Sequence, residues 1–184
     1  MRRAHGAALA GIFAATVLVL LFMGRTWWGT AEPGLWTGGV GSAQNSQLLF
    51  DPYTFTHISH GIGFYLAFWL LFKKRLPFGT LLLMATALEA GWEILENTNL
   101  VIERYREVTI AQGYFGDSIA NSLGDIAVTV VGFWLAARLP LIATIALFVG
   151  IEVVLALTIR DNLLLNIVML LYPIPAIQAW QLGG

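Results

Sequence analysis

Cysteine is absent from this sequence of 184 residues, and charged residues are scarce. The lack of cysteine excludes disulfide bonds and thiolate metal sites. Charged residues make up 11%, against about 25% in soluble domains, and the net charge of −1 gives no polybasic surface for nucleic acid. Hydrophobic residues make up 58%. This composition predicts an all-α, multi-pass membrane protein, with residues 1–184 forming a single integral membrane domain.

Long apolar stretches predict a bundle of about six transmembrane helices. These are expected at 6–23, 55–72, 78–97, 114–137, 140–159 and 163–180. The first resembles a signal peptide, but no A-x-A cleavage pattern follows Met23, so it is expected to be retained as a helix. Pro173 and Pro175 are expected to kink or end the last helix.

The glycine-rich linker 24–52 is expected on the outer face, in part lying along the bilayer, because its three tryptophans suit a membrane interface. Basic residues set the orientation of the bundle. With the N-terminus inside, the cytoplasmic segments hold Arg2, Arg3, Lys73, Lys74, Arg75 and Arg138, and the outer segments hold Arg25, Arg104, Arg106 and Arg160. This bias predicts that the N- and C-termini are both cytoplasmic.

All 11 acidic residues then fall in outer loops or in the outer halves of the helices. Three consecutive helices each carry a polar stripe at similar depth, because residues three or four apart share one helix face. The stripes consist of His57 and His60; of Glu89, Glu93 and Glu96; and of Asp117, Asn121 and Asp125. These spacings predict that the three stripes face one another.

The cost of burying acids in lipid supports a shared cavity. An acid at the centre of a membrane helix costs about 2.5–3.5 kcal/mol, so several acids facing lipid separately would be hard to sustain. Carboxylates that face one another without a cation repel. We therefore expect a water-accessible pocket that holds a cation, or over which Arg104 and Arg106 fold.

Four motifs in order carry a family resemblance: HISHGIGFY (57–65), WEILEN (92–97), an arginine-containing loop, and GDSIANSLGD (116–125). This order resembles the VanZ-like membrane proteins, with their core in helices two to four. The residues that match in order are His60, Glu93, Arg106, Asp117, Asn121 and Gly124. The sequence is more closely similar to a family of bacterial multi-pass inner-membrane proteins of unknown function. Glu96 departs from the VanZ-like pattern, which usually has Gln there.

The polar residues favour metal or acid–base chemistry. His57 and His60 with Glu93, Glu96 or Asp117 would form a nitrogen and oxygen ligand set suited to a divalent Zn, Mn or Fe ion. The alternative is that both histidines lie at the interface and bond to water and loop carbonyls. Candidate catalytic residues, acting as acids, bases or metal ligands, are Glu93, Asp117 and His60.

Five further residues are candidates for substrate binding: Arg104, Arg106, Asn121, Glu89 and Asp125. Structural roles compete with several of these assignments. Asp117 could complement a helix dipole, Asn121 could bond between helices, and the two arginines could pair with Glu103, Glu107 or lipid headgroups.

Two functional classes follow from these residues. In the first, the protein binds or acts on a lipid headgroup or lipid-linked substrate, with metal-activated water or carboxylate and histidine acid–base catalysis. In the second, it is a non-catalytic accessory subunit or a lipid or ion carrier. A structural subunit is a third option. Membrane lipids and other membrane proteins are the expected partners.

Overall fold

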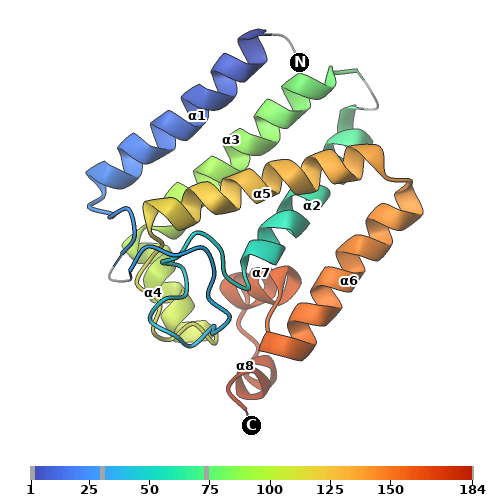
Figure 1. Ribbon diagram of the computed structural model, residues 1–184. Helices are drawn as coiled ribbons and strands as arrows, with labels where there is room; N and C mark the ends of the chain where they lie inside the picture. The colour runs from blue at the N-terminus through green and yellow to red at the C-terminus, as the bar shows by residue number, and fades with distance from the viewer. Residues whose placement is uncertain (1–2, 30–31, 73–74, 184) are drawn as a thin grey trace.

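The computed structural model describes residues 3–29, 32–72 and 75–183, and it is helical throughout apart from loops and one isolated bridge between Trp36 and Phe50. The helices of the described chain are α1 (Arg3–Phe22), α2 (Thr54–Phe72), α3 (Phe78–Glu96), α4 (Asn99–Val108), α5 (Ile119–Arg138), α6 (Leu141–Ile159), α7 (Leu163–Leu171) and α8 (Pro175–Gln181). Figure 1 shows α1 beside α3, α5 crossing the bundle, and α4, α7 and α8 gathered at one end.

Five helices, α1, α2, α3, α5 and α6, have 19 or 20 residues and are apolar enough to cross a membrane. This length suits a bilayer core, which takes about 20 residues of helix. The outer surface of α6 presents Ile142, Val149 and Leu157, which are all exposed. A helix with such a surface is stable in hydrocarbon, so the fold indicates a membrane protein.

The expected sixth membrane helix is replaced by two short ones. α7 has 9 residues and α8 has 7, with Pro175 at the start of α8. Neither is long enough to cross a bilayer. α8 therefore lies at the opposite end of the bundle from the beginning of α1 (Figure 1), whereas both ends of the chain are expected on the same side. Arg2, Lys73 and Lys74, which carry part of the charge bias used for that expectation, lie outside the described residues.

Two glycines allow α2 and α5 to pack closely. A Cβ atom at Gly61 would collide with the backbone carbonyl of Thr129, and one at Gly132 would collide with that of Ile58. The helix backbones are therefore in direct contact, as small residues permit in membrane bundles. Thr129 Oγ1 also donates to the carbonyl oxygen of His57, at 2.9 Å. This contact fixes the position of His57 relative to α5.

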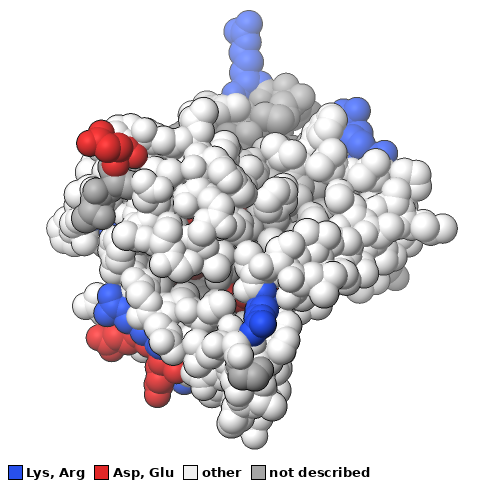
Figure 2. Space-filling view, turned by 60° about the horizontal axis from the view of Figure 1, so that its bottom comes forward, with Lys and Arg blue, Asp and Glu red and all other residues white. Residues whose placement is uncertain are grey.

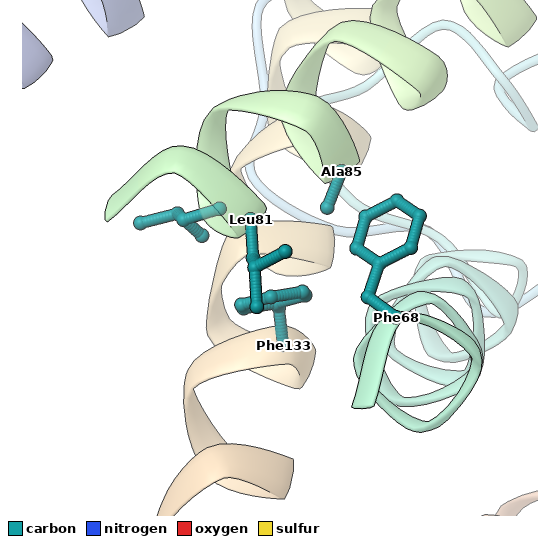
Figure 3. Packing of buried hydrophobic residues seen from close by; sticks show 5 residues of the cluster. Phe68, Leu81, Ala85 and Phe133 are labelled. Carbon is teal, nitrogen blue, oxygen red and sulfur yellow. The ribbon is translucent and has the colours of Figure 1, made fainter. Parts of the chain in front are cut away.

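An apolar cluster closes the bundle at the other end of the same helices. Figure 3 shows Phe68 of α2, Leu81 and Ala85 of α3, and Phe133 of α5 packed together. Phe133 is completely buried. The cluster holds the three helices that carry the polar stripes in a fixed arrangement.

The linker between α1 and α2 packs against the beginning of α5. The first N–H groups of a helix have no partner within the helix. Here the N–H groups of Ser118, Ile119 and Ala120 donate to the carbonyl oxygens of Ser46, Thr26 and Trp27. Ser118 caps the helix by accepting from Asn121 N at 3.1 Å. The linker is therefore a packed part of the fold at this point.

The arginine-containing loop expected between residues 97 and 116 contains α4. Ile102, Tyr105 and Val108 are its buried residues, while Glu103 and Arg106 are exposed. The buried residues recur every three positions, which places them on one face of a helix. An amphipathic helix of this kind packs on the bundle, and it contacts α3 and α7.

Candidate functional site

Histidines of α2 lie between carboxylates of α3 and α5. His57 Nδ1 is 2.5 Å from Oε1 of Glu89, and His57 Nε2 is 3.7 Å from Oδ2 of Asp125. Glu93, one turn after Glu89, brings its Oε1 to 3.5 Å from His57 Nδ1. The polar stripes of the three helices therefore meet, as their spacing predicts, and His57 is at their centre.

Glu89 binds both histidines. His60 Nδ1 lies 3.0 Å and 2.9 Å from the two carboxylate oxygens of Glu89. Glu89 is 0% exposed, Glu93 is 1% exposed, and His57 and Asp125 are also buried. Groups this far from solvent need charge partners or hydrogen bonds within the protein. Glu89 satisfies this need through the two imidazole rings.

Other polar atoms of the cluster have no such partner. Both oxygens of Glu93, Oδ1 of Asp125, Nδ2 of Asn121 and Oγ of Ser59 are buried without a hydrogen bond to any described residue. Buried polar atoms in proteins are nearly always hydrogen-bonded. The free oxygens of Glu93 and Asp125 belong to residues that lie beside His57, which marks this cluster as a place where a ligand has acceptors to bind.

A cavity of about 510 Å³ borders the cluster. His57, His60, Glu89 and Asp125 form part of its wall, together with Asn121. Further acidic side chains on the wall are Asp51, Glu96 and Asp117, and none of the described lining residues is lysine or arginine. Figure 2 shows small areas of acidic side chain at the bottom of recesses in a face that is otherwise largely uncharged. The cavity is therefore acidic and suits cations or hydrogen-bond donors.

The edge of the cavity is apolar. Leu88 of α3 and Ile167 of α7 line it and are 52% and 44% exposed. Phe64, Trp92 and Leu170 also line it and are partly exposed. The cavity thus has an apolar entrance and a polar interior. These two parts match the apolar chain and the polar head of an amphiphilic molecule.

Asp117 lies on the cavity wall but outside α5, because that helix begins only at Ile119. Its Oδ2 accepts hydrogen bonds from Tyr114 OH at 2.8 Å and Asn97 Nδ2 at 3.1 Å. Burial raises the pKa of Asp117 to about 6. Burial also raises the pKa of Asp51, although that carboxylate accepts from the backbone N–H groups of Ser46 and Tyr53.

The predicted metal ligands are only partly brought together. Two groups of described residues have ligand atoms within 4.8 Å of one another: His57, His60 and Glu89; and His57, Glu93 and Asp125. Glu96 and Asp117 belong to neither group. Glu96 is at the end of α3, about 10 Å along the helix from Glu89, and the carboxylate of Asp117 is bound to Asn97 and Tyr114. Glu89 and Asp125, expected to bind substrate, instead lie beside the histidines, as Glu93 does.

The two predicted substrate-binding arginines lie outside the cavity wall. Arg104 Nε donates to the carbonyl of Leu170, and its Nη1 is 3.6 Å from Glu107. Arg106 Nε donates to the carbonyl of Tyr114. Both arginines therefore connect α4 to neighbouring segments, and Arg104 also pairs with Glu107, which is the structural alternative expected for it.

Several residues that line the cavity, or that bind its wall, are not candidates from the sequence. Asn97 and Tyr114 bind Asp117, and Ser46 and Asp51 come from the linker. Asn97 follows Glu93 at i+4, which is a signal that it shares that helix face. No comparable signal connects the linker to the cavity, because its contacts depend on loop conformation.

Comparison with other proteins places the sequence in a family. Residues 20–183 match the DUF2585 proteins, a family described as of unknown function. The chain belongs to the DUF2585 family. The family match includes every residue of the histidine and carboxylate cluster and all of the cavity wall.

The relatives are bacterial UPF0314 proteins of similar length. One from Rhizobium meliloti (strain 1021) is 47% identical, with 96% of this chain and 89% of the relative covered. One from Novosphingobium aromaticivorans is 44% identical, over 98% of this chain and 94% of the relative. One from Paracoccus denitrificans is 49% identical, over 80% and 76%. No solved structure matches the chain.

Proposed function

We propose that the protein is a multi-pass protein of the bacterial inner membrane that binds, and acts on, the polar head of a lipid or lipid-linked substrate. The observation that carries this proposal is the cavity of about 510 Å³ with an apolar edge and an acidic interior. An amphiphilic ligand matches both parts, since its chain replaces lipid contacts at the edge while its head meets polar groups.

The side on which the cavity opens is part of the proposal. Arg3, Arg75 and Arg138 lie at the end of the bundle where α1 begins and where α5 passes into α6. The sequence assigns six basic residues to the cytoplasmic segments, these three among them, and four to the outer segments, so the positive-inside rule favours this end for the cytoplasm. The cavity is bordered by the linker, α4 and α7 at the other end, so it opens toward the outer face.

The geometry supports acid–base chemistry on the headgroup. His60 lines the cavity, and its Nδ1 is bound to Glu89, so the other ring nitrogen is free of that contact and can take or give a proton. Asp117 lines the same cavity and has a pKa of about 6, raised by burial, so that it changes protonation near neutral pH. We assign these two residues, with Glu93, to the reaction. We also propose that α2, α3 and α5 form a core similar to that of the VanZ-like proteins.

A test uses two helical glycines with open space around them. Neither Gly63 nor Gly91 has an atom within 4 Å of a Cβ built on it, but only Gly63 lines the cavity. Gly63→Leu is expected to fill the cavity and remove copurifying lipid, measured by mass spectrometry of the purified protein. Gly91→Leu is the matched control and should retain lipid. Equal lipid content in the wild type and both variants would count against the proposal.

A second candidate function is carriage of cations or protons across part of the membrane. The observation that favours it is the acidic wall without a described lysine or arginine. Intramembrane acids often mark ion or proton pathways. Proteoliposomes with a pH-sensitive dye distinguish the two functions. The carrier function is supported if the proteoliposomes take up protons without any added lipid substrate and if the Glu89→Gln variant loses this uptake.

A further inference from the structure

We propose that His57, Glu93 and Asp125 bind one divalent transition-metal ion, with Glu89 as the carboxylate that orients His57. The ligand atoms of these three residues lie within 4.8 Å of one another and come from α2, α3 and α5. This site goes beyond the proposed lipid binding, because a metal ion can be held whether or not a lipid occupies the cavity.

The distances suit a single ion. Oxygen and nitrogen ligands at about 2.1 Å from a tetrahedral ion are about 3.4 Å apart. His57 Nε2 lies 3.7 Å from Oδ2 of Asp125, and one ligand atom from each of His57, Glu93 and Asp125 lies within 4.8 Å of the other two. Small movements of these side chains are therefore enough to bring their ligand atoms to coordination distance.

The free atoms of the cluster indicate which carboxylates are ligands. Both oxygens of Glu93 and Oδ1 of Asp125 are buried and unpartnered among the described residues. The oxygens of Glu89, by contrast, are bound by His57 and His60. Glu93 and Asp125 can therefore give oxygen atoms to an ion without breaking an existing hydrogen bond.

Glu89 has the position of an orienting residue. A histidine that binds a metal usually donates its other ring N–H to a carboxylate, which fixes the tautomer. His57 Nδ1 contacts Glu89 Oε1 at 2.5 Å, which leaves Nε2, the nitrogen nearer Asp125, to bind the ion.

The charge balance also favours a cation. Glu89, Glu93 and Asp125 are buried, and the ion pairs recorded for them among the described residues involve only His57 and His60. A divalent ion would compensate the negative charge of these carboxylates that His57 and His60 do not neutralise. The mixed nitrogen and oxygen set without sulfur favours Zn, Mn or Fe over Ca or Mg, which prefer oxygen ligands alone.

The test measures metal on the full chain purified in detergent. Elemental analysis of the wild type should find about one transition-metal ion per chain. After chelation, Co²⁺ should bind and give the visible absorption of a nitrogen and oxygen site. Wild-type protein that neither carries metal nor binds Zn²⁺ or Co²⁺ would overturn the proposal, whatever the variants do.

Variants locate the ion. Glu93→Gln and Asp125→Asn should each abolish stoichiometric Zn²⁺ binding, and Glu89→Gln should weaken it by about 10–100-fold, as outer-shell changes do. Glu152→Gln is the matched control, since Glu152 is a buried carboxylate of α6 outside both ligand groups. Thermal unfolding verifies that each variant is folded. Unchanged Zn²⁺ affinity in folded Glu93→Gln and Asp125→Asn would overturn the assignment.

The lipid and metal proposals fail independently. Gly63→Leu should lose lipid yet keep metal, because Gly63 is not among the ligands. Loss of metal from Asp125→Asn with lipid retained would support the metal site alone.

Discussion

Asn97 and Asp117 form a reciprocal pair. The backbone N–H of Asp117 donates to Oδ1 of Asn97 at 2.8 Å, and Nδ2 of Asn97 donates to Oδ2 of Asp117 at 3.1 Å. The two residues connect the end of α3 to the segment that enters α5. Because α3 carries Glu89 and Glu93 while α5 carries Asp125, this pair helps to set the distance between the two carboxylate-bearing helices.

Asn97→Ala is expected to destabilise the protein by about 1–3 kcal/mol, because it leaves the buried N–H of Asp117 without its acceptor. The measurement is the melting temperature in detergent. Asn99→Ala, at the exposed start of α4, is the control and should change the melting temperature little. Equal melting temperatures for the two variants would show that the pair contributes nothing.

Close contact between α2 and α5 yields a second prediction. Gly61→Ala and Gly132→Ala should each lower the free energy of unfolding by about 1–3 kcal/mol, because the added methyl group collides with backbone that has no flexible end to move. Gly91→Ala, which meets nothing within 4 Å, should instead be neutral or gain about 0.5–1 kcal/mol from helix propensity. Thermal unfolding of the three variants measures the contrast. A stable Gly61→Ala protein would mean that the helices are further apart than described.

Spacing in the sequence was sufficient to predict which helices would meet. The stripes at 57/60, 89/93 and 121/125 lie on regular helix, where side-chain direction follows from position alone. That is why His57, Glu89, Glu93 and Asp125 come together as expected. The same reasoning could not distinguish metal ligands from the residues that orient them. Glu89 lies four residues before Glu93 and Glu96 three residues after it, so all three share one helix face.

Positions next to irregular backbone could not be predicted in this way. Asp117 was expected on the same helix face as Asn121, but the backbone of Gly116 has φ +94° and the helix begins after Ser118. A residue with left-handed backbone conformation changes the direction of the chain, and the periodicity of polar residues in the sequence does not reveal it. The break at Pro173 and Pro175 agrees with the prediction, but it leaves a helix of 9 residues before the prolines and one of 7 after them, so the expected sixth membrane helix is too short to span.

Gly116 itself leads to a third prediction. Its φ of +94° disfavours any side chain, and a Cβ there would collide with the guanidinium of Arg25. Arg25 donates to the carbonyls of Phe115 at 2.6 Å and Asn97 at 2.7 Å. Gly116→Ala should therefore cost about 1–2 kcal/mol from backbone strain alone, measured as a lower melting temperature.

The control for Gly116 lies in the same loop. Gly113 has no atom within 4 Å of a built Cβ and no left-handed φ, so Gly113→Ala should not lower the melting temperature. If both alanine variants melt like the wild type, the conformation described at Gly116 is wrong.

Protonation of Asp117 should make stability depend on pH. Burial raises the pKa of Asp117 from 3.8 to about 6, so the folded state binds the proton more tightly than the unfolded state. The stabilisation by protonation is fully present below the unfolded pKa and is lost as the pH rises through the folded pKa. The loss amounts to roughly 3 kcal/mol at about 1.4 kcal/mol per unit of pKa difference.

Asp117→Asn isolates this effect, because the amide does not titrate while its oxygen can still accept from Tyr114 and Asn97. The stability of the wild type relative to this variant should fall as the pH is raised from about 4 to about 7. Asp161, whose pKa is also raised to about 6 by burial, is present in both proteins and cancels in the comparison. Unfolding curves at several pH values measure the difference. If it stays constant over this range, the carboxylate of Asp117 does not gain a proton on folding, and its part in proton transfer loses its physical basis.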